Sequence, residues 1–398
     1  MKLKLIRAVF SFYLLLGVCM GDETRDERIR KLQEQMAALE REKAVLLEQQ
    51  ANNKPKLTEP AASRALLDES GNINLRISNS VVIIEGDLGV GTGFIAATGG
   101  KKYLYTAAHV FSGNSKLTIK NTQGTNFKKF GVLECAEGAD LVRMEILEEV
   151  KDWLEIIPAD AELPIQTEIA ALGNGGGNGV VSVEKGRILG TSADSLEVDA
   201  GIIQGNSGGP VVESSNGNAV GVVTHLSAER KDVWAEGTRQ AEVRRFACRL
   251  NKQWEWRPTS IGVFLVEGKA LAEYDELTRL CYAMVQLEPD RNGMRLEKDM
   301  GGGATIIEIL TRNKDREVVR SLFKMNADLA ESKATLSQAE LKKKFRSLVS
   351  QIHSQATRSN EAFKPQSYAW FHRSRSTVSV QARKESIEEL ASYLDRLR

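Results

Sequence analysis

The chain has few cysteines, almost no net charge and no apolar run long enough to span a membrane. Its 398 residues include 4 Cys, and 54 basic side chains nearly balance 53 acidic ones. A fold built on disulfide bridges is excluded, because such folds are dense in cysteine. A net charge of +1 gives no overall attraction to nucleic acid, so a general nucleic-acid binder is disfavoured. The hydrophobic content of 42% excludes pervasive disorder, and the length of 398 residues suggests two or three domains.

The amino-terminal apolar run is shorter than the roughly 20 residues that a spanning helix needs. Basic residues between Lys2 and Arg7 precede this run, which covers residues 8–18, and small or mixed residues follow up to Gly21. This order is typical of an export signal, so we predict a signal peptide over 1–21. Membrane association through an uncleaved signal, or through a lipid on Cys19, is the alternative.

A heptad pattern follows the predicted signal. Within 22–52, apolar residues recur at spacings of three and four among Glu, Arg, Lys and Gln, at Ile29, Leu32, Met36, Leu39 and Leu46. The pattern predicts a coiled coil that joins copies of the chain into a homo-oligomer, and a single solvated helix is the alternative. It stops at Asn53, and prolines interrupt the polar stretch that follows, so 53–79 is predicted to be a linker.

The middle of the chain has the pattern of an all-β domain. Short apolar runs separated by Gly, Asn, Asp and Ser fill residues 80–224, as in barrels and sandwiches. A helix is expected to close this unit, because apolar residues recur at helical spacing at Val243, Phe246, Ala247 and Leu250. We therefore predict one domain over 80–255.

The last part, 256–398, is predicted to be a helical region of unknown function. Helices are expected over 271–284, over 337–352 with Ser337 and Glu340 forming a capping box, and over 382–397. From Thr311 onward the segment carries 18 Lys and Arg against 10 Asp and Glu. A solvated basic surface is the default interpretation, with an acidic partner, an anionic surface or nucleic acid as alternatives.

Three short segments of the β region carry residue types suited to peptide hydrolysis. Ser207 lies in the glycine-flanked segment 205–209, where the backbone amides of Gly205 and Ser207 can point at an oxyanion. His109 follows a strand directly and would take the proton of Ser207. Asp140 begins another strand and would orient the imidazole and stabilise its positive form. Asp87, Asp152 and Asp160 are the alternatives for this third role.

These segments resemble the trypsin-like, chymotrypsin-fold serine peptidases in their compact bacterial form. The resemblance covers about residues 80–251. Within the family, this segment is most similar to the peptidase domains of HtrA-type proteins, although no peptide-binding PDZ module is recognisable downstream. It implies two six-stranded antiparallel β-barrels with the triad in the cleft between them. The stretches that carry it are 91–95, 106–109, 139–142, 198–200 with 205–210, and 220–224.

The resemblance also implies a substrate-binding region. The strand around Val223, Thr224 and His225 would line the substrate backbone, with His225 lining or packing rather than transferring protons. The base of the specificity pocket falls at Gly201, where no acidic residue stands, so a small or apolar side chain before the cleaved bond is expected. Asn206 stands where digestive relatives carry Asp, and it cannot pair with a freed amino terminus.

Together these features predict an exported serine endopeptidase, periplasmic or secreted in a bacterial envelope, that cleaves proteins or peptides through an acyl-enzyme on Ser207. No cofactor is expected. A metal site is not expected either, because Cys135, Cys248 and Cys281 lack paired spacing and nearby histidine. The alternative is an inactive envelope scaffold, in which the barrel binds peptides and the helical ends assemble with partners.

Overall fold

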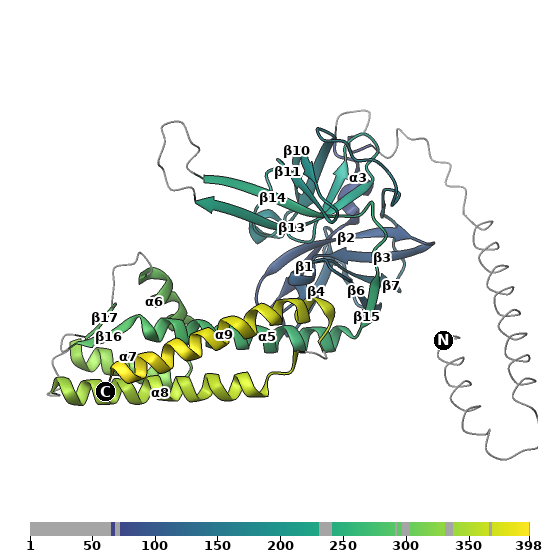
Figure 1. The fold of residues 1–398 in the computed structure, drawn as a ribbon. Coiled ribbons are helices and arrows are strands. Elements are labelled where there is room, and N and C mark those ends of the chain that lie inside the picture. The colour runs from purple at the N-terminus through teal and green to yellow at the C-terminus, as the bar shows by residue number, and fades with distance from the viewer. Residues whose placement is uncertain are drawn as a thin grey trace, which may run out of the picture. The chain divides into compact units, whose positions relative to one another are not determined.

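The structure is a computed structural model that describes residues 65–67, 72–230, 241–290, 293–296, 303–330, 337–365 and 368–397 (Figure 1). By its contacts the chain divides into residues 1–59 and 60–398, and all the described residues belong to the second unit. The predicted signal peptide and the predicted coiled coil lie outside the described residues.

The predicted linker ends in ordered structure. Residues 75–80 form the short helix α3 (Leu75–Ser80), which Asn74 caps by accepting a hydrogen bond from the amide of Arg76. Leu66 and Ile77 are almost fully buried and pack against the strands of the β domain. The last residues of the segment 53–79 are therefore part of the β domain rather than a free connection.

The first sheet of the β domain is an open sheet of nine strands. Its order is β15-β6-β7-β3-β2-β1-β4-β5, and β8 pairs with β2. The predicted closed six-stranded barrel is therefore wrong for this half of the domain. The strands are β1 (Val81–Gly86), β2 (Val90–Thr98), β3 (Lys101–Thr106), β4 (Leu117–Asn121), β5 (Asn126–Phe127), β6 (Phe130–Ala136), β7 (Val142–Ile146), β8 (Leu154–Glu155) and β15 (Trp256–Thr259).

The second sheet closes into a barrel of six strands in the order β10-β11-β14-β13-β12-β9. This confirms one of the two predicted barrels. Its interior holds aliphatic side chains such as Ile188, Leu196, Val211 and Ala247, all fully buried. The strands are β9 (Glu168–Gly173), β10 (Ser182–Thr191), β11 (Ser195–Val198), β12 (Pro210–Glu213), β13 (Ala219–Arg230) and β14 (Ala241–Arg249).

Residues 243–250, predicted to be a helix, lie mostly in strand β14. The strand pairs with β13 on one side and with β11 on the other, and its hairpin with β13 projects from the barrel (Figure 1). Ala247 faces the buried interior, whereas Val243 is 41% exposed. The helical spacing of the apolar residues is therefore coincidental, because they do not share one buried face.

The carboxyl-terminal region is helical, as predicted. The capping box of Ser337 and Glu340 is confirmed at the start of α8, and α9 begins twelve residues before the predicted Ala382. A short hairpin of β16 and β17 joins the helices. The elements are α5 (Ile261–Val285), β16 (Leu287–Asp290), β17 (Gly293–Leu296), α6 (Gly303–Arg312), α7 (Glu317–Ala330), α8 (Gln338–Ala362) and α9 (Trp370–Arg396).

Helices α5 and α9 share a hydrophobic core with the open sheet. Phe264 of α5 and Phe371 of α9 are buried with Leu104 of β3 and with Phe111 of the short helix α4 (Ala108–Phe111). Strand β15, which directly precedes α5, pairs with β6. The β domain and the start of the helical region therefore pack as one body.

Candidate active site

His109 and Asp140 are joined by two hydrogen bonds. Strand β3 ends at Thr106, and the chain turns into α4, which places His109 in the first turn of that helix. The Nδ1 of His109 lies 2.6 Å from Oδ2 of Asp140, and the backbone amide of His109 donates to Oδ1 at 2.9 Å. Both side chains are about one-third exposed. One carboxylate thus fixes both the ring and the backbone of the histidine.

The other aspartates considered as partners of His109 make different contacts. Asp87 accepts hydrogen bonds from the amides of Ser115 and Lys116, and the first of these bonds lowers its pKa. Asp152 accepts from the side-chain amide of Asn79 at 3.1 Å. Of these groups, only Asp140 is hydrogen-bonded to the ring of His109.

Ser207 lies in a turn between β11 and β12 that glycines allow. Gly205 has φ +100° and Gly208 has φ +84°, a backbone region that L side chains rarely adopt. The carbonyl of Ser207 accepts from the amide of Thr92 at 2.8 Å, and the amide of Gly208 donates to the carbonyl of Val223 at 2.7 Å. The turn is therefore fixed between β2 and β13.

This turn lies against the segment that carries His109. A Cβ added to Gly208 would come within 2.1 Å of Oγ1 of Thr106 and 3.0 Å of the amide nitrogen of Ala107. The hydroxyl of Ser207 donates weakly to the carbonyl of Thr224 at 3.5 Å. No hydrogen bond between Ser207 and His109 is present in the described part of the chain. The serine turn and the histidine helix are thus neighbours, with the last proton-transfer contact not formed.

Two amides of the turn remain available to a ligand. Within the described residues, the amides of Gly205 and Ser207 donate to no protein acceptor, whereas those of Asn206, Gly208 and Gly209 are all used inside the fold. Asn206 itself is fully buried, and its Oδ1 accepts from the amide of Ile203 at 3.1 Å. The pair of free donors is what an oxyanion site requires.

Thr92 holds the base of this turn. Its hydroxyl donates to the carbonyl of Gly205 at 2.7 Å and accepts from the amide of Asn174 at 2.9 Å, in a fully buried position. Replacing Thr92 with valine leaves both backbone groups without a partner. We expect the free energy of unfolding to fall by about 2–4 kcal/mol, measured by urea denaturation.

Thr118→Val is the matched control, because Thr118 is exposed on β4. Its unfolding free energy should stay within about 0.5 kcal/mol of the unmodified protein. An equal effect of the two substitutions would contradict a supporting role for Thr92.

The strand predicted to line the substrate is only partly suited to contact with it. The side chain of Val223 is buried inside the barrel, and its amide and carbonyl are bonded to Gly209 and Gly208. Thr224 is also buried. His225 is exposed and stacks on Phe246 with ring centroids 4.9 Å apart. Of the three predicted lining residues, only His225 offers an accessible side chain.

Two charged side chains flank the predicted pocket base at Gly201. A Cβ added to Gly201 would lie 3.0 Å from Oε2 of Glu184, which comes from β10. Arg245 of β14 donates through Nε to the carbonyl of Ile202 at 3.1 Å. The sequence motif around Gly201 could not reveal these groups, because both come from distant strands.

The three cysteines in the described residues are buried and unpaired. Burial raises the pKa of the thiols, to about 12 for Cys135 and to about 11 for Cys281, and raises that of Cys248 as well. They are therefore poor nucleophiles. The part of the chain that the structure describes holds no cluster of three or more His, Cys, Asp or Glu arranged for a metal ion.

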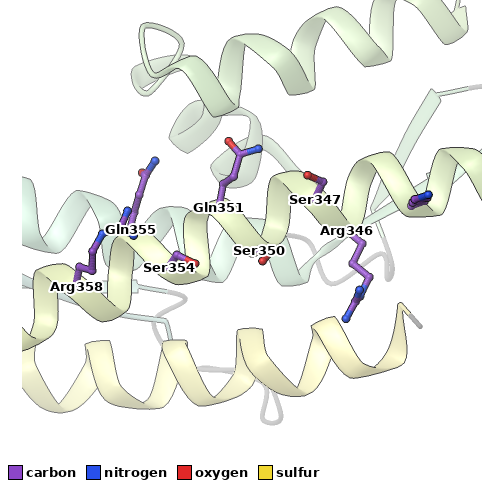
Figure 2. A pocket seen from close by; sticks show the side chains of 8 residues that line it. Arg346, Ser347, Ser350, Gln351, Ser354, Gln355 and Arg358 are labelled. Atoms are coloured by element: carbon purple, nitrogen blue, oxygen red, sulfur yellow. The ribbon is translucent and has the colours of Figure 1, made fainter.

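A large open hollow lies far from these groups in the sequence, along α8. It measures about 570 Å³, and Figure 2 shows Arg346, Ser350 and Arg358 among the side chains that line it. All eight lining residues belong to α8, and none is a predicted site residue. Among the described helices, none is long and apolar enough to cross a membrane.

Comparison with known proteins identifies the β domain. A family model described as a trypsin-like peptidase domain matches residues 91–222. The probable periplasmic serine endoprotease DegP-like of Bartonella henselae is 32% identical over 146 residues, which are 34% of this chain and 28% of the relative. The magnetosome formation protease MamE of Magnetospirillum gryphiswaldense is 28% identical over 148 residues, which are 34% of this chain and 19% of the relative.

A solved structure, the serine endoprotease from Yersinia pestis, is similar with 23% identity and a TM-score of 0.34, over 50% of this chain and 64% of that one. The chain spans less than a third of the length of either curated relative. The match to the family model spans the segment that holds the three predicted catalytic residues. Residues 91–222 therefore form a trypsin-like serine peptidase domain, similar to that of the DegP-like protease.

Proposed function

We propose that the protein is a serine endopeptidase that uses Ser207 as nucleophile, His109 as base and Asp140 as the partner of the histidine. The hydroxyl of Ser207 attacks the carbonyl carbon of the scissile bond while Nε2 of His109 takes its proton. The oxyanion accepts hydrogen bonds from the amides of Gly205 and Ser207. Collapse of the intermediate breaks the C–N bond, and the imidazolium protonates the leaving amine.

Water then completes the reaction. His109 removes a proton from the water as its oxygen attacks the ester carbonyl, and Ser207 leaves with that proton as the acid product is released. Asp140 accepts the Nδ1–H bond throughout and stabilises the positive imidazolium. The reaction needs no cofactor.

The observation that carries this proposal is the double hydrogen bond between Asp140 and His109 beside a serine turn with two free amides. A scaffold that only bound peptides would not need a histidine with both its ring and its backbone fixed by one carboxylate. We therefore favour the enzyme over the alternative of an inactive envelope scaffold.

Export and protein substrates are also part of the proposal. Two of the curated relatives are described as probable periplasmic proteases, and the amino-terminal sequence has the order of an export signal. We propose a periplasmic or secreted location in a bacterial envelope. The segment 22–52 would set a homo-oligomer. Attachment to a membrane through an uncleaved signal or a lipid on Cys19 is the alternative to release of the signal.

A fluorophosphonate tests the proposal directly, because it reacts with activated serines. The full-length protein should become labelled, and mass spectrometry of a digest should locate the label on Ser207. The same protein unfolded in urea should not react, since the unfolded chain has no base beside the serine. Failure of the folded protein to label, together with failure to cleave denatured casein, would support the scaffold instead.

Glu184 changes the expected substrate preference. The carboxylate beside Gly201 has no ion-pair partner among the described residues, whereas Arg245 already donates to the carbonyls of Ile202 and Val243. A lysine or arginine before the cleaved bond would pair with Glu184, which replaces the earlier expectation of a small or apolar residue. A partly exposed ion pair contributes on the order of 1 kcal/mol.

Glu184→Gln is expected to lower kcat/KM for lysine and arginine substrates about fivefold, and to leave alanine substrates unchanged. Peptides that differ only at that position measure the ratio. Glu162→Gln, at an exposed position, is the control and should alter neither value. A variant that keeps the preference of the unmodified protein would show that Glu184 does not reach the substrate.

A further inference from the structure

We propose that His372, together with Glu267, is a positioning residue that holds the helix of His109 from the carboxyl-terminal helices. The inference rests on the proposed function and assigns the helical region a part in catalysis. It concerns a Ser–His–Glu chain in which His372 and Glu267 are buried and Ser112 is half-buried.

The contacts run from α4 to the helices α5 and α9. Nε2 of His372, on α9, lies 3.0 Å from the hydroxyl of Ser112, and Nδ1 lies 3.1 Å from Oε2 of Glu267, on α5. Ser112 is the carboxyl-terminal cap of α4, and its amide donates to the carbonyl of Ala108 at 3.1 Å. The bonded hydroxyl is thus three residues from His109 in a helix of a single turn.

Burial sets the direction of these hydrogen bonds. His372 is fully buried, and this burial lowers its pKa, which favours the neutral ring. The carboxylate of Glu267 can only accept, so Nδ1 carries the proton and Nε2 accepts from Ser112. The same carboxylate oxygen accepts from the amide of Ala369 at 2.8 Å. Each group therefore has a partner that fixes its orientation.

Close packing fixes the same loop. A Cβ added to Gly268 of α5 would lie 2.6 Å from the amide nitrogen of Gly113 and 2.7 Å from Oγ of Ser112. Only glycine permits this approach. Phe264, one turn earlier on α5, contacts the ring of His372 in a tilted arrangement with centroids 4.2 Å apart. Helix α5 therefore packs directly against the carboxyl-terminal end of α4.

The contact between Ser112 and His372 matters for catalysis because it restricts the position of His109. A catalytic base must lie within hydrogen-bond reach of its nucleophile, and small misplacements lower the rate strongly. Asp140 holds His109 from one side, and Ser112 holds the other end of the same helical turn. The bond to His372 therefore limits how far the imidazole can move from Ser207.

Ser112→Ala removes this bond while changing a single oxygen atom. We expect kcat, measured per active site titrated with fluorophosphonate, to fall about tenfold, while KM stays within twofold. Titration matters because a purely structural defect reduces the number of active sites without slowing those that remain.

Ser376→Ala is the matched control. Ser376 is fully buried on α9, and among the described residues its hydroxyl donates to the carbonyl of Arg373 in the same helix and makes no bond to α4. Its kcat per titrated site should equal that of the unmodified protein. His372→Gln supplies a second test of the same contact, and the double variant with Ser112→Ala should be no slower than His372→Gln alone, because both remove one interaction.

The outcomes separate the two proposals. An unmodified protein that does not titrate overturns the peptidase assignment and this inference with it. An unmodified protein that titrates, with Ser112→Ala turning over at an unchanged rate per site, overturns the positioning role alone. An equal slowing by Ser376→Ala also contradicts it, since the effect would then not depend on the contact with α4.

Discussion

Ser207→Ala is expected to lower kcat for peptide hydrolysis on the order of 10⁶-fold, the scale seen when a catalytic serine is removed from this type of site. Alanine has no oxygen to attack the carbonyl, so no acyl-enzyme forms. The remaining activity would come from the oxyanion donors and from substrate binding. The rate with a fluorogenic peptide measures the change.

The substitution should hardly alter stability. The hydroxyl of Ser207 makes only a weak 3.5 Å contact with the carbonyl of Thr224, and the turn is held by backbone bonds instead. Ser182→Ala is the matched control, since its half-buried hydroxyl makes a similar 3.4 Å contact with the carbonyl of Gly173. Comparable activity in the two variants would exclude Ser207 as the nucleophile.

The triad could be predicted because each of its members lies in a short motif that is recognisable in the sequence. Thr106 to His109 places the histidine directly after a strand, and the glycines around Ser207 mark a turn with positive φ. Such local signals determine backbone geometry within a few residues. The hydrogen bond between His109 and Asp140 agrees with the pairing that the sequence predicts, although the pairing had to be chosen among several aspartates.

Barrel closure and strand β14 were harder to predict. Alternating apolar residues indicate strands, but they do not say whether the first and last strands of a sheet pair with each other. The first sheet is open, and its edge strand β15 pairs with β6 although it comes after all strands of the closed barrel in the sequence. In β14, apolar residues at helical spacing belong to a strand. Backbone pairing with β11 on one edge and β13 on the other outweighs the helical pattern of the local sequence.

The positioning contact could not be predicted from the sequence either. Ser112 and His372 are separated by 260 positions, and Glu267 lies 105 positions before His372. A single histidine within a helical pattern carries no signal of its function. Only the packing of α5 and α9 against α4 brings the three side chains together.

The second large effect is expected for Asp140→Asn, which should lower kcat/KM about 10⁴-fold while the serine remains in place. An amide at this position can donate to Nδ1, which favours the tautomer with the proton on Nε2. That tautomer cannot accept the proton of Ser207. The amide also lacks the negative charge that stabilises the imidazolium, so the loss appears in the chemical step.

Asp152→Asn distinguishes this effect from a general loss of charge. Asp152 was an alternative third member of the triad in the sequence, but its carboxylate accepts from Asn79 rather than from His109. The variant should retain kcat/KM within twofold. Steady-state kinetics with one peptide substrate compares the two, and a larger loss from Asp152→Asn than from Asp140→Asn would mean that a different aspartate serves the histidine during turnover.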